Sequence, residues 1–162
     1  MRSLSPRLLL TGLGLACAAS VVAALVAQHR FGMEPCPWCI LQRILFIVLA
    51  AFSLVAAALP HALARRLLSV LILPLAVSGM ASALWQHFVA AKSNSCALTL
   101  ADKVITFLGL DTRWPEAFEV RASCADAAAS ILGVPFEFWS LALFALAGIV
   151  VLYSALTPAR RA

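Results

Sequence analysis

The chain has 162 residues, of which 64% are hydrophobic and only 12% are charged. This balance lies far outside that of soluble globular domains, and it indicates an integral membrane protein of about one domain's length. The net charge of +5 would suit a nucleic-acid partner, but the basic residues gather in short segments beside apolar runs, so no nucleic-acid partner is expected.

Four apolar segments are each long enough to cross a hydrocarbon core, which takes about 20 helical residues. They comprise residues 8–27, 40–59, 67–85 and 138–157. Because backbone polar groups within lipid must be satisfied internally, each segment is expected to be a helix. The first is expected to be retained, since its apolar run is longer than that of a cleaved signal peptide. The sequence therefore predicts an all-α membrane protein, built as an antiparallel four-helix transmembrane bundle.

The charged residues divide between the two sides of this bundle. All seven acidic residues fall in or beside the connections of one side, at Glu34, Asp102, Asp111, Glu116, Glu119, Asp126 and Glu137. The other side carries arginines in short segments next to helix ends, at Arg2, Arg7, Arg65, Arg66, Arg160 and Arg161. Short basic segments mark the cytoplasmic side of membrane proteins. Both termini are therefore expected in the cytoplasm, with residues 28–39 and 90–135 on the opposite side.

The first outer connection contains the sequence Pro35-Cys36-Pro37-Trp38-Cys39, and Arg43 follows it. Cysteines at this spacing form a redox-active disulfide or bind a metal. If a helix starts near Cys39, its sulfur meets unpaired backbone N–H groups that favour a thiolate. Arg43 would then lie one turn further along the same face. The spacing alone leaves redox and metal chemistry both open.

The third predicted helix contains Pro74, which is expected to kink it. Its outer end carries Trp85, Gln86 and His87. Their expected role is to anchor the helix at the membrane surface. His87 would also lie near the height of Cys39 in the membrane, so a role at the same site is a second interpretation.

The second outer connection, residues 90–135, holds Cys96 and Cys124. Apolar and polar residues alternate with helical period up to residue 108, and Gly109 would end that helix. The pattern predicts a short amphipathic helix, which either lies in the membrane interface or packs on the outer end of the bundle. Residues 111–115 are expected to form a turn.

Four of the five cysteines thus lie on the outer side, where disulfides persist. The fifth, Cys17, lies mid-span and is expected to be an apolar packing residue. Static structural disulfides would account for Cys96 and Cys124. They would not explain why the first pair lies beside an arginine at the start of an apolar helix, and this position favours disulfide exchange.

In these features the sequence resembles the DsbB family, bacterial inner-membrane proteins that reoxidise the periplasmic thiol oxidase DsbA with quinone. The resemblance rests on the four spans, the cysteine motif with its arginine, the histidine ending the third span and the loop cysteines. It implies that the outer connections are periplasmic and that the catalytic residues are Cys36, Cys39, Cys96 and Cys124. It also implies a site for ubiquinone or menaquinone formed by Cys39, Arg43 and His87.

The resemblance further implies an order of thiol exchange. Reduced DsbA would attack the Cys96–Cys124 disulfide at Cys96, and Cys124 would then attack Cys36. Cys39 would leave as a thiolate facing the quinone. Arg43 would hold the negative charge that develops on the ring oxygens, and His87 would donate a hydrogen bond.

The best alternative is a heavy-metal membrane transporter of the mercuric type, because such proteins also pass soft cations between paired thiolates. This hypothesis predicts reduced cysteines and tight metal binding. The oxidase predicts disulfides and a bound quinone, with no metal site.

Overall fold

The computed structural model describes residues 5–92 and 98–157, so that the predicted catalytic residue Cys96 lies outside the described residues. Its four long helices are α1 (Pro6–Phe31), α2 (Pro37–Ala58), α3 (Ala62–Phe88) and α7 (Phe136–Leu156). Each is long enough and apolar enough to cross a membrane. The predicted four-helix membrane fold is confirmed, although α1 and α3 run several residues past their predicted ends.

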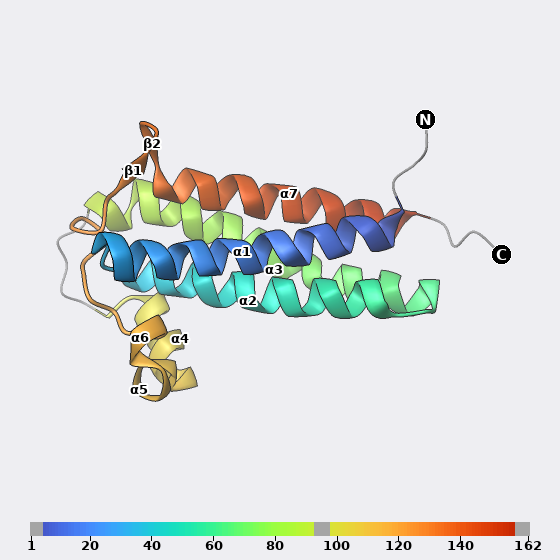
Figure 1. The fold of residues 1–162 in the computed structure, drawn as a ribbon, viewed down its shortest axis with the longest axis horizontal. Coiled ribbons are helices and arrows are strands. Elements are labelled where there is room, and N and C mark those ends of the chain that lie inside the picture. Colours follow the sequence, from blue (N-terminus) through green and yellow to red (C-terminus); the bar gives the residue numbers. More distant parts are fainter. Residues whose placement is uncertain (1–4, 93–97, 158–162) are drawn as a thin grey trace.

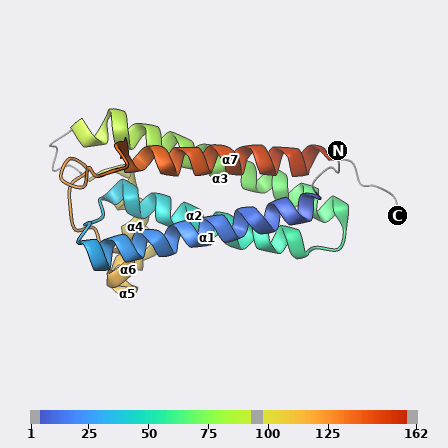
Figure 2. The same cartoon turned by 45° about the horizontal axis from the view of Figure 1, so that its top comes forward.

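The long helices form a bundle in which each packs on two neighbours. α1 packs along α2 and α3 packs along α7, while α2 with α3 and α1 with α7 close the arrangement. The connections at residues 32–36 and 59–61 are short, and this makes consecutive helices antiparallel. The start of α1 and the end of α7 consequently lie at the same end as the α2–α3 connection (Figures 1 and 2).

Local signals in the sequence set the ends of α1. Ser5 caps its first turn by accepting a hydrogen bond from the Leu8 N–H, and Pro6 occupies the first helical position. Gly32 ends the helix in the left-handed region, with φ of 63°. The chain can therefore turn sharply into the cysteine motif that precedes α2.

Two aromatic rings form the centre of the core. Phe46 of α2 and Phe144 of α7 stack with ring centroids 4.1 Å apart and planes within 6°. Gly79 of α3 makes room for this stack, since a Cβ there would lie 2.2 Å from the Phe144 ring. On the outside of the bundle, large apolar side chains such as Leu71 and Ile149 are exposed, as expected of surfaces that face lipid.

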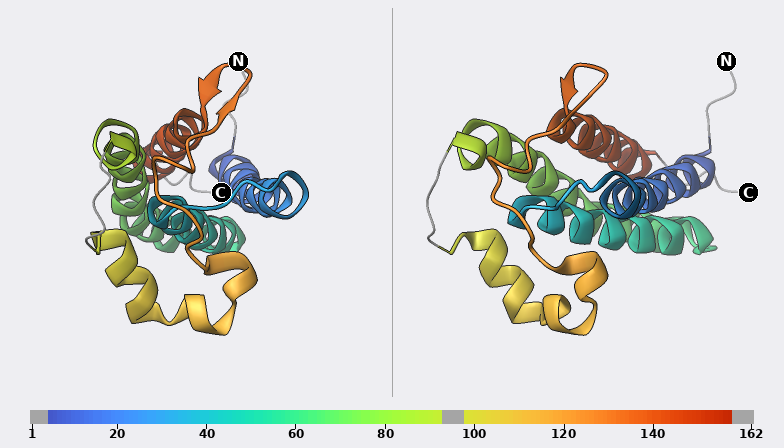
Figure 3. Two further views of the ribbon diagram at one scale, coloured as in Figure 1. Left: turned by 90° about the vertical axis from the view of Figure 1, so that its left-hand side faces the viewer. Right: turned by 60° about the vertical axis from the view of Figure 1, so that its left-hand side comes forward.

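The second outer connection lies at the end of the bundle where α2 and α7 begin, and its helical part packs beside the start of α2 (Figure 3). It contains η1 (Ala90–Lys92), α4 (Leu100–Leu108), α5 (Leu110–Arg113), α6 (Pro115–Phe118) and a two-stranded hairpin, β1 (Ser130–Ile131) with β2 (Val134–Pro135). The turn expected at residues 111–115 is instead part of two short helices, α5 and α6, separated by Trp114. The hairpin was not predicted.

α4 is the predicted amphipathic helix. It starts with a reciprocal capping box between Thr99 and Asp102 and ends at Gly109, which is left-handed. Its buried residue Ile105 packs with Ile40 of α2 and Phe118 of α6. Packing on the bundle is thus the arrangement observed for this face.

Candidate redox site

The cysteine motif forms the first turn of α2. The helix begins at Pro37, not near Cys39 as expected, so Cys36 rather than Cys39 is the capping residue. The Cys36 sulfur accepts a hydrogen bond from the Cys39 N–H at 3.3 Å, and the two sulfurs lie 2.8 Å apart. Because Pro37 has no N–H and a fixed φ, it suits the first helical position and holds the two cysteines in one turn.

The second outer connection brings Cys124 to this turn. The backbone N–H groups of Arg121 and Ala122 both donate to the Pro35 carbonyl, at 3.0 and 3.3 Å. Cys124 packs beside Cys36 in one buried cluster with Trp38 and Leu41. Both cysteines are buried. Three of the four predicted catalytic cysteines therefore meet at one place.

The three sulfurs are not electrostatically equivalent. The hydrogen bonds of Cys36 to Cys124 and then to Cys39 raise the pKa of the Cys36 thiol, and burial raises it further. The same contact with Cys36 lowers the pKa of the Cys124 thiol, and the Trp38 backbone N–H helps, while burial opposes this change. Hydrogen bonds that a thiolate accepts stabilise its charge. In the reduced protein, Cys124 is therefore favoured as the anion and Cys36 as the proton donor.

A cavity of about 260 Å³ lies between the four long helices, next to Cys39. One side is polar and comes from α2 and α3. The remaining lining is mostly apolar and comes from α1 and α7, with Phe46 of α2. The lining residues are Ser20, Val21, Ala23, Ala24, Cys39, Gln42, Arg43, Phe46, Gln86, Phe136, Trp139, Ser140 and Leu143. The cavity is suited to a mostly apolar ligand that carries a few polar atoms.

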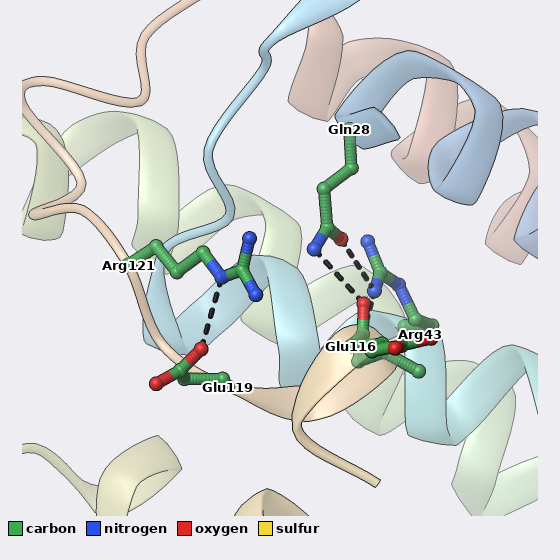
Figure 4. Close-up of polar contacts among 6 residues, drawn as sticks. Gln28, Arg43, Glu116, Glu119 and Arg121 are labelled. Atoms are coloured by element: carbon green, nitrogen blue, oxygen red, sulfur yellow. Dashed lines mark hydrogen bonds and ion pairs between the residues drawn. The ribbon is translucent and has the colours of Figure 1, made fainter. Parts of the chain in front are cut away.

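Arg43 lines this cavity and is only 5% exposed. Its Nη1 donates to the Gln28 side-chain oxygen at 3.0 Å and to the Ala117 carbonyl. Gln28 in turn donates to the Glu116 carbonyl at 3.0 Å, so that α1, α2 and α6 are joined (Figure 4). The buried Nε of Arg43 has no hydrogen-bond partner among the described residues. This free donor fits a ligand that carries a carbonyl oxygen.

Two glutamines connect α2 and α3 beside Cys39. The Gln42 side-chain nitrogen donates to the Gln86 oxygen at 2.7 Å, and the Gln86 nitrogen donates to the Cys39 sulfur at 3.3 Å. Sequence reasoning assigned Gln86 to surface anchoring and gave no role to Gln28 or Gln42. A signal was available for Gln42, because polar residues within apolar spans usually face the bundle interior. Gln28 and Gln86 lie just outside the predicted spans and gave no such signal.

His87 points to a different neighbour. Its Nδ1 lies 2.6 Å from a Glu137 carboxylate oxygen, and its ring packs against Phe88 and Phe138. His87 is not among the residues that line the cavity. A quinone-binding role for this residue stays a prediction.

Comparison with known proteins identifies the chain. The family model described as "Disulfide bond formation protein DsbB" matches residues 6–154. The chain belongs to the DsbB family. It is therefore a membrane protein with disulfide oxidoreductase activity in disulfide bond formation.

Curated relatives of the DsbB family are similar along most of their length. "Disulfide bond formation protein B 1" of Pseudomonas entomophila is 33% identical over 140 residues, which cover 86% of this chain and 83% of that protein. The protein of the same name from Pseudomonas putida is 32% identical with the same coverage. "Disulfide bond formation protein B" of Burkholderia thailandensis is 30% identical over 141 residues, again with 86% and 83% covered.

Membership of the DsbB family gives no support to the metal-transporter alternative. Cys17 lies apart from the other described cysteines, buried in the core cluster with Leu13 and Leu49.

Proposed function

We propose that this protein reoxidises a periplasmic dithiol oxidase of the DsbA type and passes the two electrons to a membrane quinone. The observation that carries the proposal is the position of α2. Its first turn places Cys36 against Cys124, and the same turn places Cys39 on the cavity that Arg43 lines. A thiol relay and an apolar acceptor site thus share one helix end.

The thiol steps follow from the sulfur contacts and from the family resemblance. The partner's thiolate attacks the Cys96–Cys124 disulfide at Cys96, which releases Cys124 as a thiolate. Cys124 then attacks Cys36 of the Cys36–Cys39 disulfide, so that a Cys36–Cys124 bond forms and Cys39 leaves with the electron pair. The second partner thiol resolves the mixed disulfide and releases Cys96. Cys96 then attacks Cys124, which restores the Cys96–Cys124 disulfide and releases Cys36, so that Cys36 and Cys39 remain as the dithiol that carries the two electrons. The packing of Cys124 beside Cys36 supports its role as the attacking group.

A quinone, when bound, would accept the two electrons and two protons of the Cys36–Cys39 dithiol. Arg43 and Cys39 would hold it in the cavity, with His87 as a proposed further donor. The permanent charge of the Arg43 guanidinium, in a poorly hydrated site, favours negative charge on a neighbouring oxygen. Its buried Nε, which has no hydrogen-bond partner among the residues that the structure describes, supports this role.

We also propose that the protein lies in the bacterial inner membrane with both termini in the cytoplasm. Arg7, Arg65 and Arg66 lie in the first turns of α1 and α3, at the end opposite the cysteines. Arg7 donates to the Leu59 and Pro60 carbonyls, and Arg66 donates to the Ala155 carbonyl at 2.8 Å. The cysteines would then face the oxidising periplasm.

The test follows the state of every cysteine by mass spectrometry. Purified protein is mixed with reduced DsbA, with and without ubiquinone-1. We expect the purified protein to contain both disulfides at the start and to form a mixed disulfide with DsbA through Cys96. Oxidised DsbA should exceed the amount of this protein only when quinone is present.

Other results would overturn this proposal. If the purified protein contained reduced cysteines that bind a soft metal tightly, a metal transporter would be favoured. Inert disulfides with no turnover in either mixture would leave a structural protein. Turnover that is independent of quinone would retain the DsbA partner and exclude the proposed acceptor.

A further inference from the structure

The Cys39 sulfur accepts a hydrogen bond from a side chain outside its own helix. Gln86 of α3 donates its amide N–H to this sulfur at 3.3 Å. Gln86 is 6% exposed, and Gln42 is 4% exposed. Both line the cavity together with Cys39. The amide therefore lies where water is scarce and where a thiolate would otherwise have few donors.

Gln42 fixes which atom of Gln86 faces the sulfur. An amide side chain can point either its oxygen or its nitrogen at a neighbour. The Gln42 nitrogen donates to the Gln86 oxygen at 2.7 Å. That contact occupies the oxygen and leaves the nitrogen to donate toward Cys39. Gln42 lies on α2, one turn from Cys39, so α2 and α3 hold the donor in place jointly.

We propose that Gln86 is a catalytic residue that stabilises the departing Cys39 thiolate, and that Gln42 is the positioning residue that orients it. The step concerned is the attack of Cys124 on Cys36, in which the Cys36–Cys124 bond forms and the Cys36–Cys39 bond breaks. Cys39 takes the electron pair and becomes an anion. A donor aimed at the sulfur favours this anion, and a better leaving group speeds the exchange.

The inference rests on the proposed function for its place in the reaction, but it is tested without DsbA or quinone. The protein is prepared with Cys17, Cys36, Cys96 and Cys124 replaced by alanine, so that Cys39 is the only thiol. The rate of its alkylation by iodoacetamide is then measured from neutral to strongly alkaline pH. Gln86→Met removes the donor and keeps the length of the side chain, and Gln42→Met removes only the orienting contact.

The expected result is a fall of about tenfold in the neutral-pH alkylation rate for Gln86→Met, because one charge-assisted hydrogen bond to the thiolate is lost. Gln42→Met should show a smaller fall. At strongly alkaline pH, where every thiol is ionised, all rates should converge. Ser78→Ala is the matched control, since Ser78 lies on α3, is exposed and bonds only the Pro74 carbonyl in the described residues. The alkylation rate of Ser78→Ala should equal that of the parent at every pH.

An unchanged neutral-pH rate in Gln86→Met would overturn the proposal. So would a fall that persists at alkaline pH, because that pattern reports altered access of the reagent and not altered ionisation. Thermal unfolding in detergent shows whether each variant is folded; if Gln86→Met is not, Gln42→Met decides by the same criterion. Failure of quinone turnover in the parent would count against the proposed function and leave this result standing.

Discussion

Gln28 accepts a hydrogen bond from Arg43 at 3.0 Å across the interface between α1 and α2. No carboxylate pairs with Arg43 within the part of the chain that the structure describes. Its observed acceptors, the Gln28 amide and the Ala117 carbonyl, are neutral. The guanidinium is therefore anchored without being neutralised. Its charge remains available to a ligand that becomes negative in the cavity.

Two substitutions of Gln28 should distinguish the anchoring of the Arg43 side chain from the effect of its free positive charge. Gln28→Leu removes the acceptor of a buried charged donor, and we expect the free energy of unfolding to fall by about 1–3 kcal/mol. Gln28→Glu keeps the acceptor but adds a negative charge beside Arg43, so it should retain more stability and still slow quinone reduction. Thermal unfolding and quinone-dependent turnover measure the two effects. Equal turnover in Gln28→Glu and the parent would contradict the role assigned to the free charge.

Arg43→Ala should weaken quinone reduction while sparing thiol exchange with DsbA. Loss of a charged donor to the ligand predicts a rise of about tenfold or more in the quinone concentration that gives half-maximal rate. Arg121→Ala is the matched control, since the exposed Arg121 side chain bonds only Glu119 in the described residues. The rate of mixed-disulfide formation should be the same in all three proteins. If variant and parent showed the same dependence on quinone concentration, Arg43 would have no such role.

The pH dependence of Cys124 reactivity should depend on Cys36. The hydrogen bond from Cys36 lowers the pKa of Cys124, so Cys124 should remain a thiolate to lower pH than an ordinary cysteine, whose pKa is about 8.5. In fully reduced Cys36→Ala protein, the alkylation profile of Cys124 should move to higher pH. Cys36→Ser, which still carries a donor, should shift it less. Peptide mass spectrometry resolves the individual sites, and identical profiles in parent and Cys36→Ala would contradict the assigned donor.

Gly79→Ala tests the close approach of α3 and α7. The added Cβ would lie 2.2 Å from the Phe144 ring, which is itself stacked on Phe46. We expect the free energy of unfolding to fall by about 1–3 kcal/mol through overpacking. Gly12→Ala is the matched control, because nothing lies within 4 Å of a Cβ at that position. Equal thermal stability of the two variants would show that the helices adjust freely around Phe144.

The sequence by itself determined the parts of the protein that depend on near neighbours. Helical spans need only a run of apolar residues, since lipid leaves no other way to satisfy the backbone. The closeness of Cys36 to Cys39, and of Arg43 to both, follows from positions within two turns of one helix. The capped amphipathic helix α4 was likewise predictable from periodicity and from Gly109.

Only the tertiary structure decided which distant residues meet. Cys124 reaches Cys36 because Arg121 and Ala122 bond the Pro35 carbonyl, a contact that no local pattern encodes. Gln28 and Gln86 enter the site because α1 and α3 pack against α2 with particular faces inward. Helix packing fixes these rotations through the summed fit of many side chains. A residue's partners across the bundle are therefore a property of the whole fold and not of its own sequence neighbourhood.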